Sequence, residues 1–187
     1  MAKHNIYLVG FMGTGKSTIG RELARVMGRK CIDIDQELEK LYGCTVSEMF
    51  TNYGESWFRQ KEYQLCKELS ESTNKVVATG GGTLFNGNVF ELFNRSGLMI
   101  CLYTEKDRLI ERLERANPLK RPLLQNTDIP EKVDSLLEKR QWLYDKITIR
   151  IDTTNYTPME TARKIAELLK KRQLILNRLR DQYIDLT

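Results

Sequence analysis

The fold is decided by residues 10–18, Gly-Phe-Met-Gly-Thr-Gly-Lys-Ser-Thr, which fill every fixed position of a G-x-x-x-x-G-K-[ST] phosphate loop. The apolar run 6–9 comes directly before this loop and predicts a buried strand, and residues 16–28 carry apolar side chains at helical spacing. The glycines let the backbone curl tightly enough to point several N–H groups inward, and the helix N-terminus adds partial positive charge. Strand, glycine-rich turn and helix together predict a nucleotide phosphate site.

Two side chains of the loop suit particular parts of this chemistry. The ammonium group of Lys16 can reach the outer phosphates, and the hydroxyl group of Ser17 can hold Mg²⁺. We expect the phosphates to be bound by Gly13, Thr14, Gly15, Lys16, Ser17 and Thr18. A glycine-rich turn with a chance lysine is the alternative, and the matching strand and helix on either side argue against it.

Length and composition indicate an ordinary globular chain. It has 187 residues, of which 41% are hydrophobic and 29% charged. No apolar run approaches the roughly 20 residues of a membrane span, and the short polar N-terminus does not look like a signal peptide. We therefore expect a single domain over residues 1–187, located in the cytoplasm and without membrane contact.

Charge and residue usage argue against several other classes. The net charge is +5, but basic residues alternate with acidic ones, and an anionic ligand explains the excess as well as nucleic acid does. The only histidine is His4, so a Ser/His/Asp site is not expected. The four cysteines show no C-x-x-C spacing, which is typical of reduced structural residues. We expect a monomer that does not bind nucleic acid.

Short apolar segments alternate with helical ones, which indicates an α/β fold with a parallel sheet covered on both faces. Strands are predicted at 5–9, 30–34, 75–79, 98–103 and 147–151. Helices are predicted at 16–27, 35–42, 45–51, 55–72, 86–94, 105–115 and 130–146, with a last helix from about 158 past 170. Thr45 with Glu48 forms a capping-box signature for one of these helices. The tail, about 173–187, either prolongs that helix or docks on a neighbour. Ligands of such sheets bind beyond the carboxyl ends of the strands.

Residues 116–128 interrupt this alternation with a long loop between two helices. Two prolines bracket Lys120-Arg121 inside it. A lid that closes over bound nucleotide and a plain connector are the two interpretations, and the arginine favours the lid.

Asp33 and Asp35 stand at the end of the second predicted strand, near the phosphate loop. If the strand continues through both, alternation places the two carboxylates on the same side. A phosphotransferase uses one carboxylate to hold Mg²⁺ and another to orient the attacking hydroxyl group and accept its proton. Asp35 also suits the N-cap of the next helix, and the two roles are compatible.

Two further segments are informative mainly in combination. Residues 54–62 open a long helix on which Arg59 and Glu62 are close enough to touch. An ordinary surface ion pair is the alternative interpretation of these two residues. Gly80-Gly81-Gly82 follows the third strand and leaves backbone N–H groups open to a ligand. The alternative is a tight strand-to-helix turn, for which one or two glycines would suffice.

Arginines also lie on the two helices that flank the presumed lid. Arg112 and Arg115 precede it and Arg140 follows it. Arginine suits two-pronged contacts with carboxylate or phosphate and stacking on a base. Each of the three, taken alone, is better explained as a solvated charge on a helix face.

Taken in order, these motifs resemble the shikimate kinase family. The matching segments are the phosphate loop 10–18, Asp33-Ile34-Asp35, Gly54-Glu55 with Phe58-Arg59 and Glu62, Gly80-Gly81-Gly82, Arg121-Pro122-Leu123-Leu124, and Arg140 before Leu143-Tyr144. The resemblance covers about residues 5–170. Many ATPases and GTPases share the phosphate loop, whereas the ordered set is far more specific.

The resemblance implies ATP-dependent phosphorylation of the 3-hydroxyl group of shikimate, in aromatic amino-acid biosynthesis. It implies a P-loop fold like that of the nucleoside monophosphate kinases, with a five-stranded parallel sheet flanked by helices and a mobile lid. Mg²⁺ would be the cofactor, and ATP the co-substrate.

The family's roles carry over to residues of this chain. Lys16 would stabilise the transferring phosphoryl group, and Asp35 would bind substrate hydroxyl groups and orient the attacking one. Ser17 would ligate Mg²⁺ directly and Asp33 through water. Arg121 would reach the phosphates from the lid.

The remaining roles concern the acceptor and the base. Arg59 and Arg140, with a backbone N–H group of the Gly81 region, would hold the shikimate carboxylate. Arg115 would stack on adenine.

Two alternatives stay open from the residues themselves. Another small-molecule kinase, such as a gluconate or nucleotide kinase, shares the phosphate loop, but Asp35 with two arginines fits a hydroxy acid better than a nucleotide. A GTP-dependent switch would need an N-K-x-D motif, and the nearest string, Asn74-Lys75-Val76-Val77, lacks the aspartate.

Overall fold

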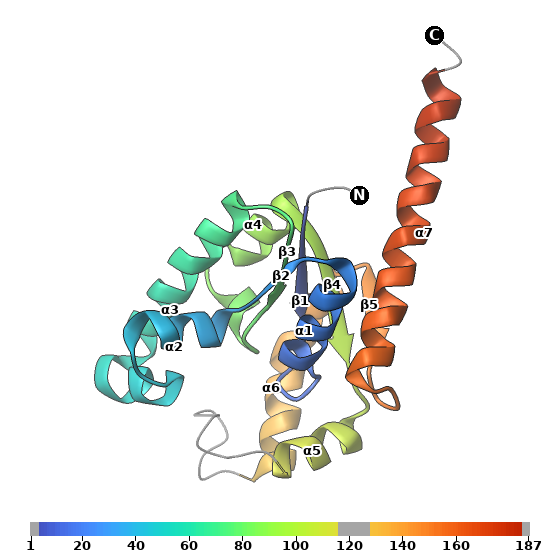
Figure 1. The fold of residues 1–187 in the computed structure, drawn as a ribbon. Coiled ribbons are helices and arrows are strands. Elements are labelled where there is room, and N and C mark those ends of the chain that lie inside the picture. Colours follow the sequence, from blue (N-terminus) through green and yellow to red (C-terminus); the bar gives the residue numbers. More distant parts are fainter. Residues whose placement is uncertain (1–3, 116–127, 185–187) are drawn as a thin grey trace.

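A five-stranded, wholly parallel sheet forms the centre of the computed structural model, which describes residues 4–115 and 128–184, with side chains up to 174 (Figure 1). Its strands are β1 (Asn5–Val9), β2 (Lys30–Asp33), β3 (Lys75–Ala78), β4 (Gly97–Tyr103) and β5 (Ile149–Asp152). They lie in the order β2-β3-β1-β4-β5. The five predicted strands and the parallel sheet are thereby confirmed.

Helices connect the strands and cover both faces of the sheet. They are α1 (Lys16–Met27), α2 (Ile34–Tyr42), α3 (Val46–Glu71), the 3₁₀ turn η1 (Thr83–Phe85), α4 (Val89–Ser96), α5 (Lys106–Glu114), α6 (Ile129–Tyr144) and α7 (Pro158–Ile184). No helix of the described ranges is long and apolar enough to cross a membrane. The predicted lid, apart from residue 128, lies outside the described residues.

The alternation of side chains along β1 sorts the core into two layers. Ile6 and Leu8 pack in the cluster that includes α1 and α7. Tyr7 and Val9 pack in the other cluster, with side chains from α3, α4 and α6. Because all five residues of β1 are buried, this strand is held rigidly, and so is the start of the loop that follows it.

Local capping explains several helix boundaries. Thr45 and Glu48 form the predicted capping box at the start of α3, each side chain accepting a hydrogen bond from the other residue's backbone N–H group. Gly54, at φ 82°, breaks the helical geometry inside α3. This break separates the two predicted helices, 45–51 and 55–72.

The second strand ends one residue earlier than predicted, and the cap of the next helix lies two residues earlier than predicted. β2 ends at Asp33, whose carboxylate accepts a hydrogen bond from the Gln36 N–H group and caps α2. Asp35 therefore lies in the first turn of α2, and strand alternation does not relate it to Asp33. The physical reason is that a side-chain acceptor at the earlier position already satisfies the helix N-terminus.

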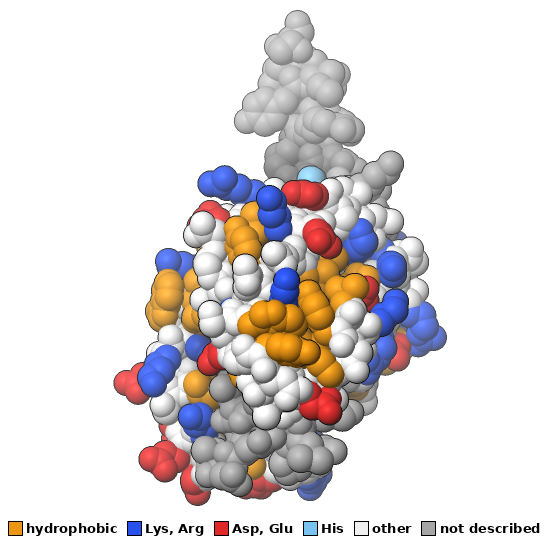
Figure 2. Space-filling model, turned by 90° about the vertical axis from the view of Figure 1, so that its left-hand side faces the viewer, with side chains coloured by type: hydrophobic (Ala, Val, Ile, Leu, Met, Phe, Trp, Pro, Cys, Tyr) orange, Lys and Arg blue, Asp and Glu red, His pale blue; other side chains and the backbone are white. Residues whose placement is uncertain are grey.

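Figure 2 looks onto the side of the molecule that carries α2 and α3, and hydrophobic side chains gather near the middle of this face. Exposed large hydrophobic residues of these two helices are Leu41, Tyr42 and Tyr53. The rings of Tyr42 and Tyr53 pack on Trp57, with centroid distances of 4.9 and 4.5 Å. These contacts hold the end of α2 against α3.

Phe93 provides a test of the core. It is completely buried and stacks on Tyr7 of β1, with ring centroids 3.9 Å apart. Phe93→Ala should lower the free energy of unfolding by about 3–5 kcal/mol, because it opens a cavity under the central strand. Urea denaturation measures this, with Val26→Ala on the exposed side of α1 as a control expected to change it by less than about 0.5 kcal/mol. An equal loss in both variants would contradict the proposed core.

Candidate active site

The phosphate loop leaves the buried strand β1 and enters α1 through three glycines with positive φ, namely 135° at Gly10, 85° at Gly13 and 92° at Gly15. A Cβ atom at Gly10 would lie 2.2 Å from the carbonyl oxygen of Leu102 on β4, so no larger residue fits there. The buried Lys16 donates hydrogen bonds from Nζ to the carbonyl groups of Gly10 (2.8 Å) and Phe11 (2.9 Å). The ammonium group is thus held against the loop itself.

A second set of hydrogen bonds, which the sequence did not predict, connects the loop to the segments that follow β4 and β5. The Thr153 hydroxyl group, just after β5, donates to the carbonyl oxygen of Thr14 at 3.1 Å. Arg112 of α5 donates to the Thr153 carbonyl oxygen at 2.7 Å and to the Thr104 hydroxyl group at 3.0 Å. Arg112 therefore ties the turns after β4 and β5 to the loop.

Asp35 faces the loop from the first turn of α2. Burial raises the pKa of its carboxyl group to about 7, with further increases from the negative charges of Glu62 and Asp33. The positive charges of Lys16 and Arg59 act in the opposite direction. A carboxylate with a pKa near neutral is suited to accept a proton from a hydroxyl group.

The glycine triplet after β3 is where the other site residues meet. A Cβ atom at Gly80 would lie 2.8 Å from Oδ1 of Asp35, and one at Gly82 would lie 2.9 Å from Nη2 of Arg59. The carbonyl oxygen of Gly81 accepts a hydrogen bond from Nη1 of Arg140 at 3.1 Å. Gly80 and Gly82 thus leave room for Asp35 and Arg59, and the backbone of Gly81 contacts Arg140.

Arg59 is held by two carboxylates of its own helix. Nη1 donates to the completely buried Glu62 at 2.7 Å, and Nη2 contacts the exposed Glu55 at 3.2 Å. Burial by itself would lower the pKa of the guanidinium group, but Glu62 and Glu55 outweigh burial and raise it. The arginine is therefore permanently charged, with one firm and one solvent-accessible partner.

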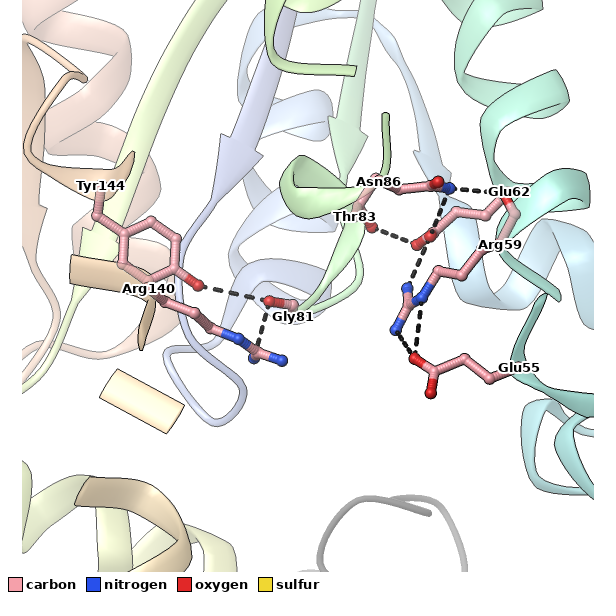
Figure 3. Close-up of polar contacts among 8 residues, drawn as sticks. All are labelled: Glu55, Arg59, Glu62, Gly81, Thr83, Asn86, Arg140 and Tyr144. Atoms are coloured by element: carbon pink, nitrogen blue, oxygen red, sulfur yellow. Dashed lines mark hydrogen bonds and ion pairs between the residues drawn. The ribbon is translucent and has the colours of Figure 1, made fainter. Parts of the chain in front are cut away.

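Arg140 of α6 approaches the glycine triplet from the opposite side (Figure 3). Only 9% of it is exposed, and its guanidinium group lies over the rings of Phe11 and Phe85. Within the described ranges it forms no ion pair, and both its burial and the charge of Arg59 lower its pKa. A buried cation that contacts a carbonyl group, aromatic rings and the Tyr144 hydroxyl group, but forms no ion pair among the described residues, is suited to bind an anion.

The structure brings most of the predicted site residues to one edge of the sheet. The phosphate loop, Asp33, Asp35, Arg59, Gly81 and Arg140 all lie at or next to its carboxyl end. Arg115 ends α5 with its side chain 74% exposed and paired with Glu111. Arg121 lies outside the described residues.

Oxygen ligands for a divalent cation are also present at this edge. Ser17 opens α1 beside the loop, and Asp33 caps α2. Among the described side chains there is no group of three or more His, Cys, Asp or Glu residues that could hold a metal ion. A hydroxyl group and one carboxylate fit Mg²⁺, which keeps several waters and binds largely through phosphates.

Comparisons with known proteins agree with this geometry. A family model described as shikimate kinase matches residues 12–170. The shikimate kinase of Thermodesulfovibrio yellowstonii is 38% identical over 161 residues, which are 86% of this chain and 92% of that protein. That of Pelotomaculum thermopropionicum is 36% identical over 171 residues, 91% of this chain and 98% of that one.

Solved structures give the same result. A shikimate kinase from Acinetobacter baumannii in complex with shikimate has a TM-score of 0.87 and 36% identity, covering 92% of this chain and 96% of that one. A gluconokinase from Sinorhizobium meliloti, at 15% identity and a TM-score of 0.52, shares the fold alone.

Asp35 also makes a stability prediction. Its folded-state pKa of about 7 lies above the ordinary aspartate value of 3.8, so the stability that it contributes is complete below the lower value and is lost as the pH rises through the higher. Asp35→Asn cannot ionise and should exceed the wild type in stability by about 1–2 kcal/mol at pH 8, with the gap closing towards pH 4. Urea denaturation across this range measures the gap. Asp107→Asn, an exposed aspartate in the first turn of α5, is the control, and a gap independent of pH would contradict the raised pKa.

Proposed function

The chain belongs to the shikimate kinase family, and on this premise we propose that the site at the carboxyl edge of the sheet transfers the terminal phosphoryl group of ATP to the 3-hydroxyl group of shikimate. The enzyme is a small-molecule kinase. The observation that carries the assignment of the site is the pair Arg59 and Arg140, two buried or half-buried guanidinium groups of which, among the described residues, Arg59 alone forms an ion pair with a buried carboxylate, that of Glu62. The carboxylate of a hydroxy acid balances the charge of the other guanidinium group, that of Arg140.

Acceptor binding follows from these two arginines and the glycine triplet. Arg59 and Arg140 bind the shikimate carboxylate from opposite sides of Gly81, whose backbone lies close enough to contribute its N–H group. With the carboxylate fixed there, Asp35 binds hydroxyl groups of the ring and orients the attacking one. The acceptor is thus held at two separated points, which fixes its orientation.

Phosphoryl transfer uses the remaining residues of the same edge. Asp35 accepts the proton of the attacking hydroxyl group, whose oxygen forms the new bond to the terminal phosphorus while the bond to ADP breaks. Lys16 leaves its loop carbonyl groups for the phosphates and stabilises the charge that develops on them. The N–H groups of Gly13, Thr14, Gly15, Ser17 and Thr18 complete the phosphate cradle.

Mg²⁺ fits the oxygen donors at this edge. Ser17 would ligate it directly and Asp33 through water, and when bound it would neutralise charge on the outer phosphates. From the family resemblance we also propose that Arg121, within a lid over about 116–128, contacts the phosphates. Arg115 is proposed to stack on adenine from the end of α5.

We further propose that residues 1–187 form a single kinase domain that acts as a monomer in the cytoplasm, with no nucleic-acid partner. All described residues with a proposed role come from one chain and one edge of one sheet, so a second copy need not contribute to the site.

Acceptor specificity is the direct test of the function. ADP release with Mg-ATP should require shikimate and should be absent with gluconate and with nucleoside monophosphates. Lys16→Ala, with its fold checked by circular dichroism, should lower turnover by at least about 10³-fold. Turnover with gluconate or a nucleotide alone would reassign Asp35, Arg59 and Arg140 to that acceptor.

Gly82 offers a sharper test of the carboxylate site. Its backbone, at φ −109°, suits alanine, so Gly82→Ala adds only a methyl group next to the Arg59 guanidinium group. Displacement of that group should raise the KM for shikimate about tenfold or more, while the KM for ATP stays within about twofold. Gly20→Ala inside α1, where a Cβ atom would meet its neighbours at ordinary contact distances of 3.4–3.5 Å and the backbone φ is not positive, is the control glycine substitution and should leave both unchanged. An equal rise in both KM values for Gly82→Ala would show that Arg59 is misplaced.

A further inference from the structure

Glu62, the buried partner of Arg59, is itself held by residues from η1 and the segment after it. Its Oε1 atom accepts a hydrogen bond from the Thr83 hydroxyl group at 2.7 Å. Its Oε2 atom accepts one from Arg59 Nη1 at 2.7 Å and one from Asn86 Nδ2 at 3.2 Å (Figure 3). In the part of the chain that the structure describes, Thr83 is the hydrogen-bond donor to Oε1.

Asn86 joins the same network at a second point. Its Nδ2 atom also donates to the backbone carbonyl oxygen of Arg59 at 2.5 Å. One side chain thus contacts both the backbone of Arg59 and the carboxylate that holds the Arg59 guanidinium group. The position and the direction of this arginine are set together.

Because Glu62 and Thr83 are completely buried, the loss of one of these hydrogen bonds would be costly. Glu62 and Thr83 have no exposed surface, so water cannot replace a lost donor without entering the core. A carboxylate that loses the donor to one oxygen turns towards the donors that remain, which here are Arg59 and Asn86. The guanidinium group of Arg59 would turn with it.

The connection also runs back to the glycine triplet. Thr83 follows Gly82 directly, and Gly82 packs against the Arg59 guanidinium group. A Cβ atom at Gly80 would lie 3.0 Å from the Thr83 hydroxyl oxygen, next to Asp35. The turn that contacts Asp35 and Arg140 is thereby linked through one hydroxyl group to the carboxylate that fixes Arg59.

We propose that Thr83 and Asn86 are positioning residues for the acceptor's carboxylate. They contact no substrate and act through Glu62, which they hold in the orientation that aims Arg59 at the site. This inference rests on the proposed role of Arg59 in binding shikimate, and it adds a part of the specificity apparatus that lies outside the family motifs quoted above.

The test compares substitutions at Thr83. Thr83→Val keeps the shape and removes the hydroxyl group, and it should raise the KM for shikimate about tenfold, with the KM for ATP within about twofold. Thr83→Ser keeps the hydroxyl group and should stay within about threefold of the wild type. Thr79→Val removes another buried hydroxyl group, bonded to the Leu8 carbonyl oxygen, and should leave both KM values unchanged. Equal KM values for shikimate in Thr83→Val and wild type would overturn the proposal.

A second arm asks whether Thr83 acts through Arg59. In an Arg59→Ala background, Thr83→Val should lower kcat/KM for shikimate by less than about twofold further, because the group that it positions is gone. A full additional tenfold loss would assign Thr83 a separate role and refute the proposed route. Asn86→Asp, which replaces the donor by an acceptor facing Glu62, should raise the KM for shikimate at least as much as Thr83→Val, and no rise would remove Asn86 from the proposal.

An NMR measurement separates this inference from the proposed function. The ¹⁵N–¹H signal of Arg59 Nε should shift in Thr83→Val and Asn86→Asp and stay unchanged in Thr79→Val, whichever acceptor the enzyme uses. Failure of the wild type to phosphorylate shikimate would overturn the proposed function, whereas an unmoved Arg59 signal would overturn the positioning role.

Discussion

Repulsion between Arg59 and Arg140 is the constraint around which the site is organised. Both groups are withdrawn from water, and charges interact more strongly in the protein interior than on the surface. Glu62 forms an ion pair with Arg59, whereas the contacts of Arg140 in the described part of the chain are a carbonyl group, two aromatic rings and the Tyr144 hydroxyl group. In the proposed function, a ligand that brings one carboxylate relieves the repulsion, so the charge of the acceptor is selected together with its hydroxyl groups. Shikimate has one carboxylate, and its ring hydroxyl groups are proposed to bind Asp35.

The parallel sheet makes this arrangement possible because it directs separate strands towards the same edge. β1 delivers the phosphate loop, β2 ends at the start of the helix that carries Asp35, and β3 delivers the glycine triplet. The order β2-β3-β1-β4-β5 puts β1 in the middle of the sheet, where packing on both faces holds the strand in place. Asp35 and the glycine triplet follow β2 and β3, Arg140 reaches the triplet from α6, and Arg112 connects the loop to the turns after β4 and β5.

How much the sequence predicted depends on whether a signal is local. The phosphate loop, the capping box and the five strands follow from spacing within a few residues, and they were confirmed. The boundary at Asp33 was missed because two acids, two residues apart, suit the same cap, and only competition for the backbone N–H groups decides between them. The bonds from Thr83 to Glu62 and from Arg112 to Thr153 span 21 and 41 residues, and a threonine or arginine by itself does not name its partner.

Charge balance also links substrate binding to proton transfer. The proton affinity of Asp35 is raised by burial, Glu62 and Asp33, and it is lowered by Lys16 and Arg59. In the proposed mechanism the phosphates occupy Lys16 and the acceptor's carboxylate occupies Arg59, so each substrate neutralises one of the two cations that weaken Asp35 as a base. Asp35 therefore becomes the strongest proton acceptor when both substrates are present. The same network that binds the acceptor thus prepares the carboxylate that activates its hydroxyl group.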